Sequence, residues 1–204
     1  MKILPSIIAS DLTNIAETIK KHTLTECHFD VMDGVFVPEI SIGSFVAKQL
    51  RDRFPSLKLD VHLMVYDPVK QVENFISLDN VYRVIFHFEG SHHHRRLAEK
   101  IKVCGKEAGI AVNPETPPEF LQYVLDVFDC VCIMTVSPGY AGQTLIQACL
   151  QKVDVVRTYR DRINPRCKIV LDGGITSGII ADLEKRGVDE VVMGSAFFGS
   201  LEGC

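Results

Sequence analysis

Eight short apolar runs recur along this chain of 204 residues, and they constrain its fold more than any other feature. Between the runs lie stretches in which apolar residues recur with helical spacing. Short strands that alternate with single helices form βαβ units and a parallel sheet. Eight such units predict a (β/α)8 TIM barrel, and no G-x-G-x-x-G motif follows the first run to support a Rossmann-like sheet instead. The apolar runs are residues 3–8, 27–32, 59–65, 81–88, 109–113, 128–136, 168–172 and 189–194.

The spacing predicts helices over residues 12–21, 44–53, 68–76, 95–108, 117–125, 146–162 and 177–186. No linker or low-complexity segment divides the chain, so we expect residues 1–204 to form a single barrel domain. After the eighth run only SAFFGSLEGC remains, which is too short for a full eighth helix. We therefore expect the last helix to be largely missing. Either the barrel is imperfectly closed there, or a neighbouring subunit of a homo-oligomer covers the exposed surface.

Charge and composition exclude several classes of partner. The net charge is −4, which gives no electrostatic case for a nucleic acid or an acidic membrane. No apolar run approaches the roughly 18 residues of a membrane span, and the N-terminal run is broken by Pro5 and ended by Asp11, unlike a signal peptide. The seven cysteines are odd in number and form no C-x-x-C pair, as is typical of a cytoplasmic protein with free thiols.

Imidazoles and carboxylates lie at the ends of the predicted strands, where barrel enzymes carry their chemistry. His28 and Asp30 are two residues apart, so they point to the same face of their strand. His62 lies in the third strand and Asp172 ends the seventh. Taken alone, His62 is more simply a core histidine, and Asp172 is equally well a helix cap. Together they form a mixed nitrogen and oxygen site for a divalent ion, which would compensate the cost of burying the carboxylates.

Glycines follow three consecutive strands and suggest a phosphate site. Glycine lets backbone N–H groups approach an anion closely, and the loops after strands seven and eight are the usual phosphate site of such barrels. A metal beside a phosphate, without a Ser-His-Asp or Cys-His arrangement, suggests proton abstraction next to the carbonyl of a sugar phosphate, through an enediolate. The residues of these loops are Gly139, Gly142, Gly173, Gly174, Gly194 and Ser195.

Seven motifs, in order and with matching spacing over nearly the whole chain, resemble the ribulose-phosphate 3-epimerase family. They are PSIIASDL (5–12), HFDVMDGVFVP (28–38), DVHLMV (60–65), NPETP (113–117), MTVSPGYAGQ (134–143), LDGGI (171–175) and MGSAFF (193–198). The resemblance implies one bound divalent ion, usually Zn²⁺, Fe²⁺, Mn²⁺ or Co²⁺, and an acid/base pair formed by Asp30 and Asp172. It also implies that His28, Asp30, His62 and Asp172 are the metal ligands. The residues implied to contact the substrate are Ser6, Met32, Met64, Met134 and the loop residues named above.

The resemblance implies a C3 epimerase of a ketose phosphate, D-ribulose 5-phosphate being converted to D-xylulose 5-phosphate. Two readings stay open: a related 3-epimerase of D-allulose 6-phosphate, and a barrel that binds a sugar phosphate without turning it over. Val35 and Ala141 depart from the residues usual in the family, as does the short last helix. We expect Val35 and Tyr140 to influence the size of substrate that fits. Decarboxylases of this fold need a D-x-K-x-x-D pattern, which the chain lacks.

Overall fold

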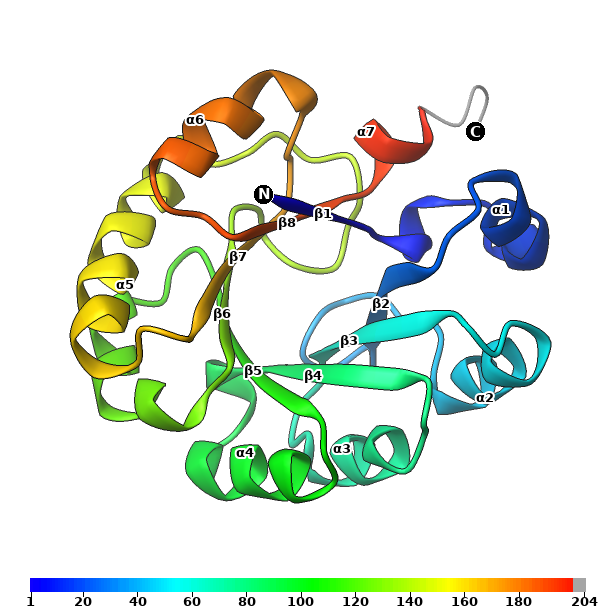
Figure 1. Ribbon diagram of the computed structural model, residues 1–204, viewed down its shortest axis with the longest axis horizontal. Coiled ribbons are helices and arrows are strands. Elements are labelled where there is room, and N and C mark those ends of the chain that lie inside the picture. Colours follow the sequence, from blue (N-terminus) through cyan, green and yellow to red (C-terminus); the bar gives the residue numbers. More distant parts are fainter. Residues whose placement is uncertain (200–204) are drawn as a thin grey trace.

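Eight parallel strands form one sheet that curls into a nearly closed barrel, with helices on its outside (Figure 1). The structure is a computed structural model, and it describes residues 1–199. Neighbouring strands follow the order β1-β8-β7-β6-β5-β4-β3-β2. The predicted (β/α)8 barrel is therefore confirmed. The strands are β1 Lys2–Pro5, β2 Glu26–Met32, β3 Lys58–Met64, β4 Val81–His87, β5 Glu107–Val112, β6 Cys130–Met134, β7 Lys168–Asp172 and β8 Glu190–Met193.

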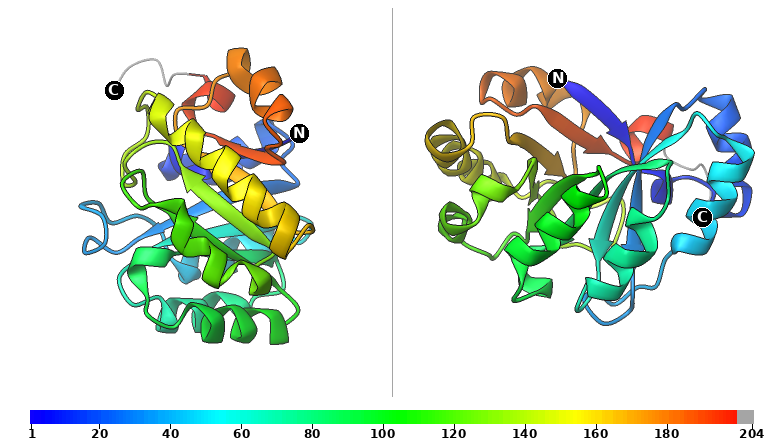
Figure 2. Two further views of the ribbon diagram at one scale, coloured as in Figure 1. Left: turned by 90° about the vertical axis from the view of Figure 1, so that its left-hand side faces the viewer. Right: turned by 60° about the horizontal axis from the view of Figure 1, so that its bottom comes forward.

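The helices surround the sheet and cover its outer face (Figure 2). The last of them, α7, is a single turn that packs on the end of α1, where the rings of His22 and Phe198 lie 5.2 Å apart between centroids. This single turn agrees with the expected short last helix, although residues 200–204 lie outside the described part of the chain. The helices are α1 Ile15–Lys21, α2 Ser44–Arg53, α3 Val69–Ile76, α4 His94–Val103, α5 Leu150–Ile163, α6 Ile180–Lys185 and α7 Ser195–Phe198.

One predicted helix takes a different form. Residues 117–125 were expected to be α-helical, but the chain forms a 3₁₀ helix at Pro118–Tyr123 and a second at Leu125–Val127. Two consecutive prolines, Pro117 and Pro118, begin this segment. Pro117 is the N-cap and Pro118 the first residue of this segment, where a proline is compatible with either type of helix. The spacing of the apolar residues alone does not distinguish the two helix types.

Pairing around the barrel is continuous except at one seam. β2 and β3 pair over seven positions, from Glu26 with Lys58 to Met32 with Met64. Between β1 and β2, by contrast, the described residues form only an isolated parallel bridge from Ser6 to His28. The expected imperfect closure therefore lies between the first two strands, and not after the eighth strand, which pairs with β1 over four positions.

Both faces of the sheet are buried, as is usual for parallel sheets. The outward face packs against the helices; the rings of Phe29 on β2 and Phe75 on α3 lie 6.1 Å apart, for example. The interior is divided. One part of it, contributed by β1 and β4–β8, is apolar, whereas β2, β3 and the end of β7 contribute imidazoles and carboxylates, and β4 and β8 add the buried polar residues Arg83, His87 and Glu190. The apolar interior cluster consists of Leu4, Ile85, Ala111, Cys130, Cys132, Met134, Val170 and Val192.

The cysteines of the described residues, Cys27, Cys104, Cys130, Cys132, Cys149 and Cys167, are free thiols. Burial raises the pKa of Cys27 and of Cys167 to about 12, so these groups remain protonated at neutral pH. Cys204 lies outside the described residues. Within residues 1–199 no helix is long and apolar enough to cross a membrane.

Candidate metal centre and active site

The register of β2 and β3 places the polar side chains of the interior in rows. His28 pairs with Asp60, Asp30 with His62, and Met32 with Met64. Because side chains alternate along a strand, all six face the same side of the sheet, which is the barrel interior. The methionine pair lies nearest the carboxyl ends of the two strands, where barrel enzymes hold their substrates. Two strands of seven residues thus build most of one wall of the site.

The structure brings together the four residues predicted to bind a metal. Nε2 of His28 lies 3.2 Å from Nδ1 of His62, and both nitrogens lie 3.3 Å from Oδ1 of Asp30. Oδ2 of Asp172, which reaches the cluster from β7, lies 3.5 Å and 3.4 Å from the same two nitrogens. Four donor atoms placed about 2.1 Å from a shared tetrahedral centre are about 3.4 Å apart. The spacing of the donor atoms therefore fits a divalent ion.

The charges of the cluster also favour a cation. Burial opposes ionisation of Asp30, but the nearby His28 and hydrogen bonds from His28 and His62 lower the pKa of Asp30 below its usual range. Burial likewise opposes protonation of His28, yet Asp30 and Asp60 raise the pKa of His28 well above its ordinary value. Without a metal the buried carboxylates thus hold protons on the imidazoles. A divalent ion bound among the four donors would take the place of those protons.

Each histidine of the cluster has a second buried partner. Nδ1 of His28 lies 2.8 Å from Oδ2 of Asp60, and Nε2 of His62 lies 2.9 Å from Nε2 of His87. His87 in turn lies 3.4 Å from Oε2 of Glu89 through its Nδ1. Burial lowers the pKa of His87 to about 4, so this ring is neutral and can accept a hydrogen bond from His62. These outer partners fix which nitrogen of each ring faces the site.

A pocket of about 350 Å³ opens beside the cluster. Both predicted acid/base residues lie on its wall, and Oγ of Ser6 donates a 2.6 Å hydrogen bond to Oδ2 of Asp30. The structure thus gathers all the residues expected to contact the substrate around one cavity, while their roles remain predictions. On the wall are Ser6, Met32, Met64, Met134, Gly139, Gly142, Gly173, Gly174, Gly194 and Ser195.

Among the wall residues that were not singled out from the sequence, two hold neighbouring segments in place. Ser41 accepts a hydrogen bond from the backbone N–H of Met32 and donates one to the carbonyl oxygen of Asp30, which fixes the end of β2. Gln143 donates to the carbonyl oxygens of Ser137 and Tyr140 and so pins the loop that follows β6. Serine and glutamine are common loop residues, so neither stands out in a sequence. The signals that could have identified Ser41 and Gln143 were the turn after β2 and the glutamine at the end of the glycine-rich loop.

The two positions expected to influence substrate size differ in their placement. Tyr140 lies on the pocket wall. Val35 is 73 % exposed on the loop that extends away from the barrel after β2, outside the residues that line the pocket (Figure 2). Asp33 holds this loop by accepting hydrogen bonds from the backbone N–H groups of Val35, Phe36 and Tyr66. Val35 therefore does not form part of the pocket wall, and its influence on substrate size stays a prediction.

A (β/α)8 barrel with two histidines and two aspartates gathered beside a pocket at one end of its strands defines a class of barrel enzymes that work at a divalent metal site. Comparison with known proteins narrows this class. The model of the ribulose-phosphate 3 epimerase family matches residues 2–198. The chain belongs to the ribulose-phosphate 3-epimerase family, which confirms the resemblance found in the motifs.

Named relatives agree with this assignment. The chain is 38 % identical over 206 aligned residues to the ribulose-phosphate 3-epimerase of Aquifex aeolicus, covering 99 % of this chain and 92 % of that protein. It is 36 % identical to the Escherichia coli K12 ribulose-phosphate 3-epimerase, with 96 % and 88 % covered. It is also 36 % identical to the chloroplastic ribulose-5-phosphate-3-epimerase of Arabidopsis thaliana, with 98 % and 72 % covered.

Solved structures support the fold. A mutant tryptophan synthase alpha-subunit from Pyrococcus furiosus superposes with a TM-score of 0.67 at 16 % identity, covering 97 % of this chain and 88 % of that one. At this identity the likeness concerns the barrel architecture alone.

Proposed function

We propose that this protein is a metal-dependent 3-epimerase that interconverts D-ribulose 5-phosphate and D-xylulose 5-phosphate. The observation that carries the proposal is the position of two carboxylates on one pocket. Asp30 comes from β2 and Asp172 from β7, both line the cavity, and both lie within 3.5 Å of the same two imidazole nitrogens. Inversion at a carbon needs proton removal on one face and proton return on the other, so it needs two such groups.

His28, Asp30, His62 and Asp172 would hold the ion, and two imidazoles with two carboxylates suit Zn²⁺, with Fe²⁺, Mn²⁺ and Co²⁺ as alternatives. A bound divalent ion would act as a Lewis acid toward the oxygens of a ketose and offset negative charge that develops during proton abstraction. Zn²⁺ is the ion we would test first, because its preferred tetrahedral arrangement matches the spacing of the donors.

The protein's own groups supply the proton transfers and the surroundings of the reaction. Asp30 and Asp172 each remove or return the proton at C3, one on each face of the substrate. Ser6 orients Asp30 through its hydrogen bond to Oδ2. The sulfur-bearing side chains of Met32, Met64 and Met134 form an apolar part of the wall that excludes water, which strengthens electrostatic interactions in the pocket.

The phosphate would lie at the far side of the pocket, among the loops after β6, β7 and β8. These loops contribute Gly142, Gly173, Gly174, Gly194 and Ser195 to the wall. Backbone N–H groups of glycine-rich loops bind phosphate oxygens without a side chain in the way. A phosphate held there leaves the carbonyl end of a five-carbon ketose free to reach the two aspartates.

The direct test is turnover of D-ribulose 5-phosphate by protein loaded with Zn²⁺, with D-allulose 6-phosphate assayed in parallel. Rapid formation of D-xylulose 5-phosphate, together with exchange of the C3 proton with solvent, is the expected result. Preference for the six-carbon substrate would assign the protein to hexose phosphates. Bound Zn²⁺ and bound sugar phosphate without turnover would replace the proposed enzyme with a binding protein.

We also propose that the protein is cytoplasmic and forms a homo-oligomer. Free thiols that are mostly buried suit a reducing compartment. Val35, Ile40 and Phe45, between 72 % and 76 % exposed along one segment, form apolar surface of the kind that subunit contacts cover. Sedimentation at micromolar concentration tests this, and a stable monomer would contradict it.

A further inference from the structure

On the side of its ring away from the pocket, His28 contacts the carboxylate of Asp60, which does not line the pocket. Oδ2 of Asp60 lies 2.8 Å from Nδ1 of His28, and both side chains are fully buried. Asp60 precedes His62 by two residues on β3 and lies directly across from His28 in the strand register. With Nδ1 engaged by a carboxylate, Nδ1 keeps its proton when a divalent ion displaces the proton on Nε2. Nε2 is then the nitrogen with a free lone pair, and it faces Asp30, Asp172 and His62.

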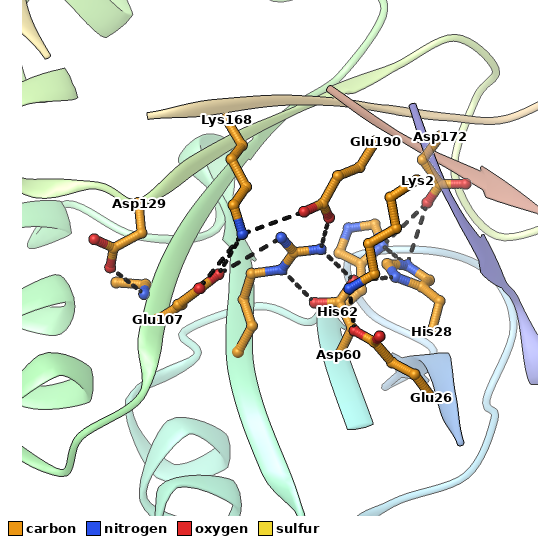
Figure 3. A network of polar contacts seen from close by, with 12 residues as sticks. Lys2, Glu26, His28, Asp60, His62, Glu107, Asp129, Lys168, Asp172 and Glu190 are labelled. Carbon is orange, nitrogen blue, oxygen red and sulfur yellow. Dashed lines mark hydrogen bonds and ion pairs between the residues drawn. The ribbon is translucent and has the colours of Figure 1, made fainter. Parts of the chain in front are cut away.

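Asp60 is itself held by a fully buried arginine. Nε and Nη2 of Arg83 on β4 donate to the two carboxylate oxygens of Asp60 at 2.7 Å and 2.8 Å. This paired geometry fixes the plane of the carboxylate as well as its position. The interior below the metal site is thus occupied by a charged network, which continues from Arg83 to Glu190 at 2.8 Å and from Glu190 to Lys168 at 3.3 Å (Figure 3).

The two histidines present different nitrogens to the site, and their outer partners account for the difference. His28 presents Nε2, because Asp60 occupies Nδ1. His62 presents Nδ1, because its Nε2 contacts His87 at 2.9 Å. The ring orientation therefore depends in each case on the group behind the ring. Of these two groups, Asp60 is the charged one, and Arg83 fixes its position through two hydrogen bonds.

We propose that Asp60, fixed by Arg83, is a positioning residue that sets the metal affinity of this site by holding His28 with Nε2 toward the ion. The inference rests on the proposed function, in that it concerns the metal that the epimerase would use. Asp60 does not touch the substrate pocket, so its effect on catalysis is exerted entirely through His28. Loss of such an outer carboxylate partner generally weakens metal binding roughly 10- to 100-fold.

The test compares Asp60→Asn with Glu190→Gln in the full chain. Each change neutralises one buried carboxylate that pairs with Arg83, but only the first alters the contact to His28. Zn²⁺ affinity is measured by competition with a chromophoric chelator, and the protonated nitrogen of each ring is assigned by ¹⁵N NMR. We expect Asp60→Asn to weaken Zn²⁺ binding roughly 10- to 100-fold and to change the His28 signals. Glu190→Gln should leave both readouts close to those of the parent protein.

A second variant guards against misfolding. Asp60→Asn leaves the charge of Arg83 with less compensation. The double variant Asp60→Asn/Arg83→Met removes both members of this pair, and Lys168, 3.3 Å from Glu190, still compensates the carboxylate that Arg83 also contacts. Buried pairs replaced together are tolerated better than pairs that lose one partner. The double variant should fold and still bind Zn²⁺ more weakly than the parent protein.

Three outcomes separate this inference from the proposed function. Equal weakening in Asp60→Asn and Glu190→Gln would make the effect one of general barrel stability and overturn the positioning role. Unchanged Zn²⁺ affinity in both Asp60 variants would overturn it as well, while leaving the epimerase intact. A parent protein that binds no Zn²⁺, Fe²⁺, Mn²⁺ or Co²⁺ would instead remove the proposed function itself.

Discussion

The hydroxyl of Ser6 donates a 2.6 Å hydrogen bond to Oδ2 of Asp30, beside the bridge from Ser6 to His28 that joins β1 to β2. The residue that links the two strands at the seam of the barrel is therefore also the one that orients a proposed acid/base group. The pairing of these strands and the geometry of the pocket are coupled through a single side chain.

Replacing Ser6 with alanine should lower kcat roughly 10- to 100-fold, since a hydrogen bond to a charged group contributes about 1.5–3 kcal/mol. The control is Ser10→Ala, because Ser10 is also buried but donates to the carbonyl oxygen of Ile7 at 2.7 Å and not to Asp30. Steady-state kinetics of both variants measure the difference. Equal losses of kcat in the two variants would show that the segment, and not the contact to Asp30, matters.

Replacing Asp172 with asparagine should reduce turnover by more than the roughly 10²–10⁴-fold typical of a lost acid/base group, because the residue is also expected to bind the metal. Turnover and bound Zn²⁺ should both fall. Asp182→Asn, on the exposed surface of α6, is the matched control, since within residues 1–199 the side chain of Asp182 pairs only with Lys185, at 3.6 Å. Full metal occupancy in Asp172→Asn would contradict the dual role.

The stability of the protein in acid should depend on Glu89. Burial opposes ionisation of this carboxyl, but hydrogen bonds from His87, Thr116 and the backbone of Asn113 lower its pKa from 4.5 to about 2. Because the folded pKa lies below the unfolded one, the stabilisation is complete above about pH 4.5 and is lost as the pH falls toward about 2. It amounts to at most about 3 kcal/mol.

Urea unfolding at several pH values measures this dependence. Glu89→Gln should lose less stability over that acid range than the parent protein, and Thr116→Val, which removes one of the hydrogen bonds, should fall between them. Parallel stability curves for all three proteins would exclude Glu89 as a source of the acid sensitivity.

A methyl group at Gly174 should disrupt the loop after β7. A Cβ there would lie 2.4 Å from the backbone nitrogen of Leu145, whereas one at Gly142 would meet open space. Both glycines have a positive φ, +66° and +76°, so alanine brings similar backbone strain of about 1–2 kcal/mol at either position. Gly174→Ala should therefore lower the free energy of unfolding clearly more than Gly142→Ala, and chemical denaturation compares them. Equal costs would mean that Leu145 moves aside freely.

The sequence was informative wherever the chemistry followed a local pattern. Alternation along a strand places His28 and Asp30 on one face, and the order of apolar runs predicts the barrel that brings Asp172 beside them. Asp60 and Arg83 were not recognised, because each is a single charge within an apolar run. Their pairing depends on the register of β3 against β4, which shifts between Leu59 and Asp60. The available signal was the arginine inside the apolar run VYRVIFHF. An arginine in such a run is expected to be buried, as Arg83 is, and a buried charge requires a partner.

Other differences arose from features that apolar spacing does not record. The segment after Pro117 forms 3₁₀ turns where an α-helix was expected, and the spacing of its apolar residues is compatible with both. The loop carrying Val35 leaves the barrel because Asp33 accepts three backbone hydrogen bonds at its base. Such local hydrogen bonding competes with regular structure and depends on loop geometry more than on residue type.

Three of the four proposed ligands, His28, Asp30 and His62, precede Asp172 by more than half the length of the chain. During synthesis on the ribosome, the first three emerge long before the strand that carries the last one. A growing chain can therefore offer an ion an incomplete set of donors only, and the fourth arrives when β7 joins the sheet. An ion bound by all four residues would therefore indicate that the barrel has assembled. A chain interrupted before β7 lacks Asp172 and cannot form the complete site.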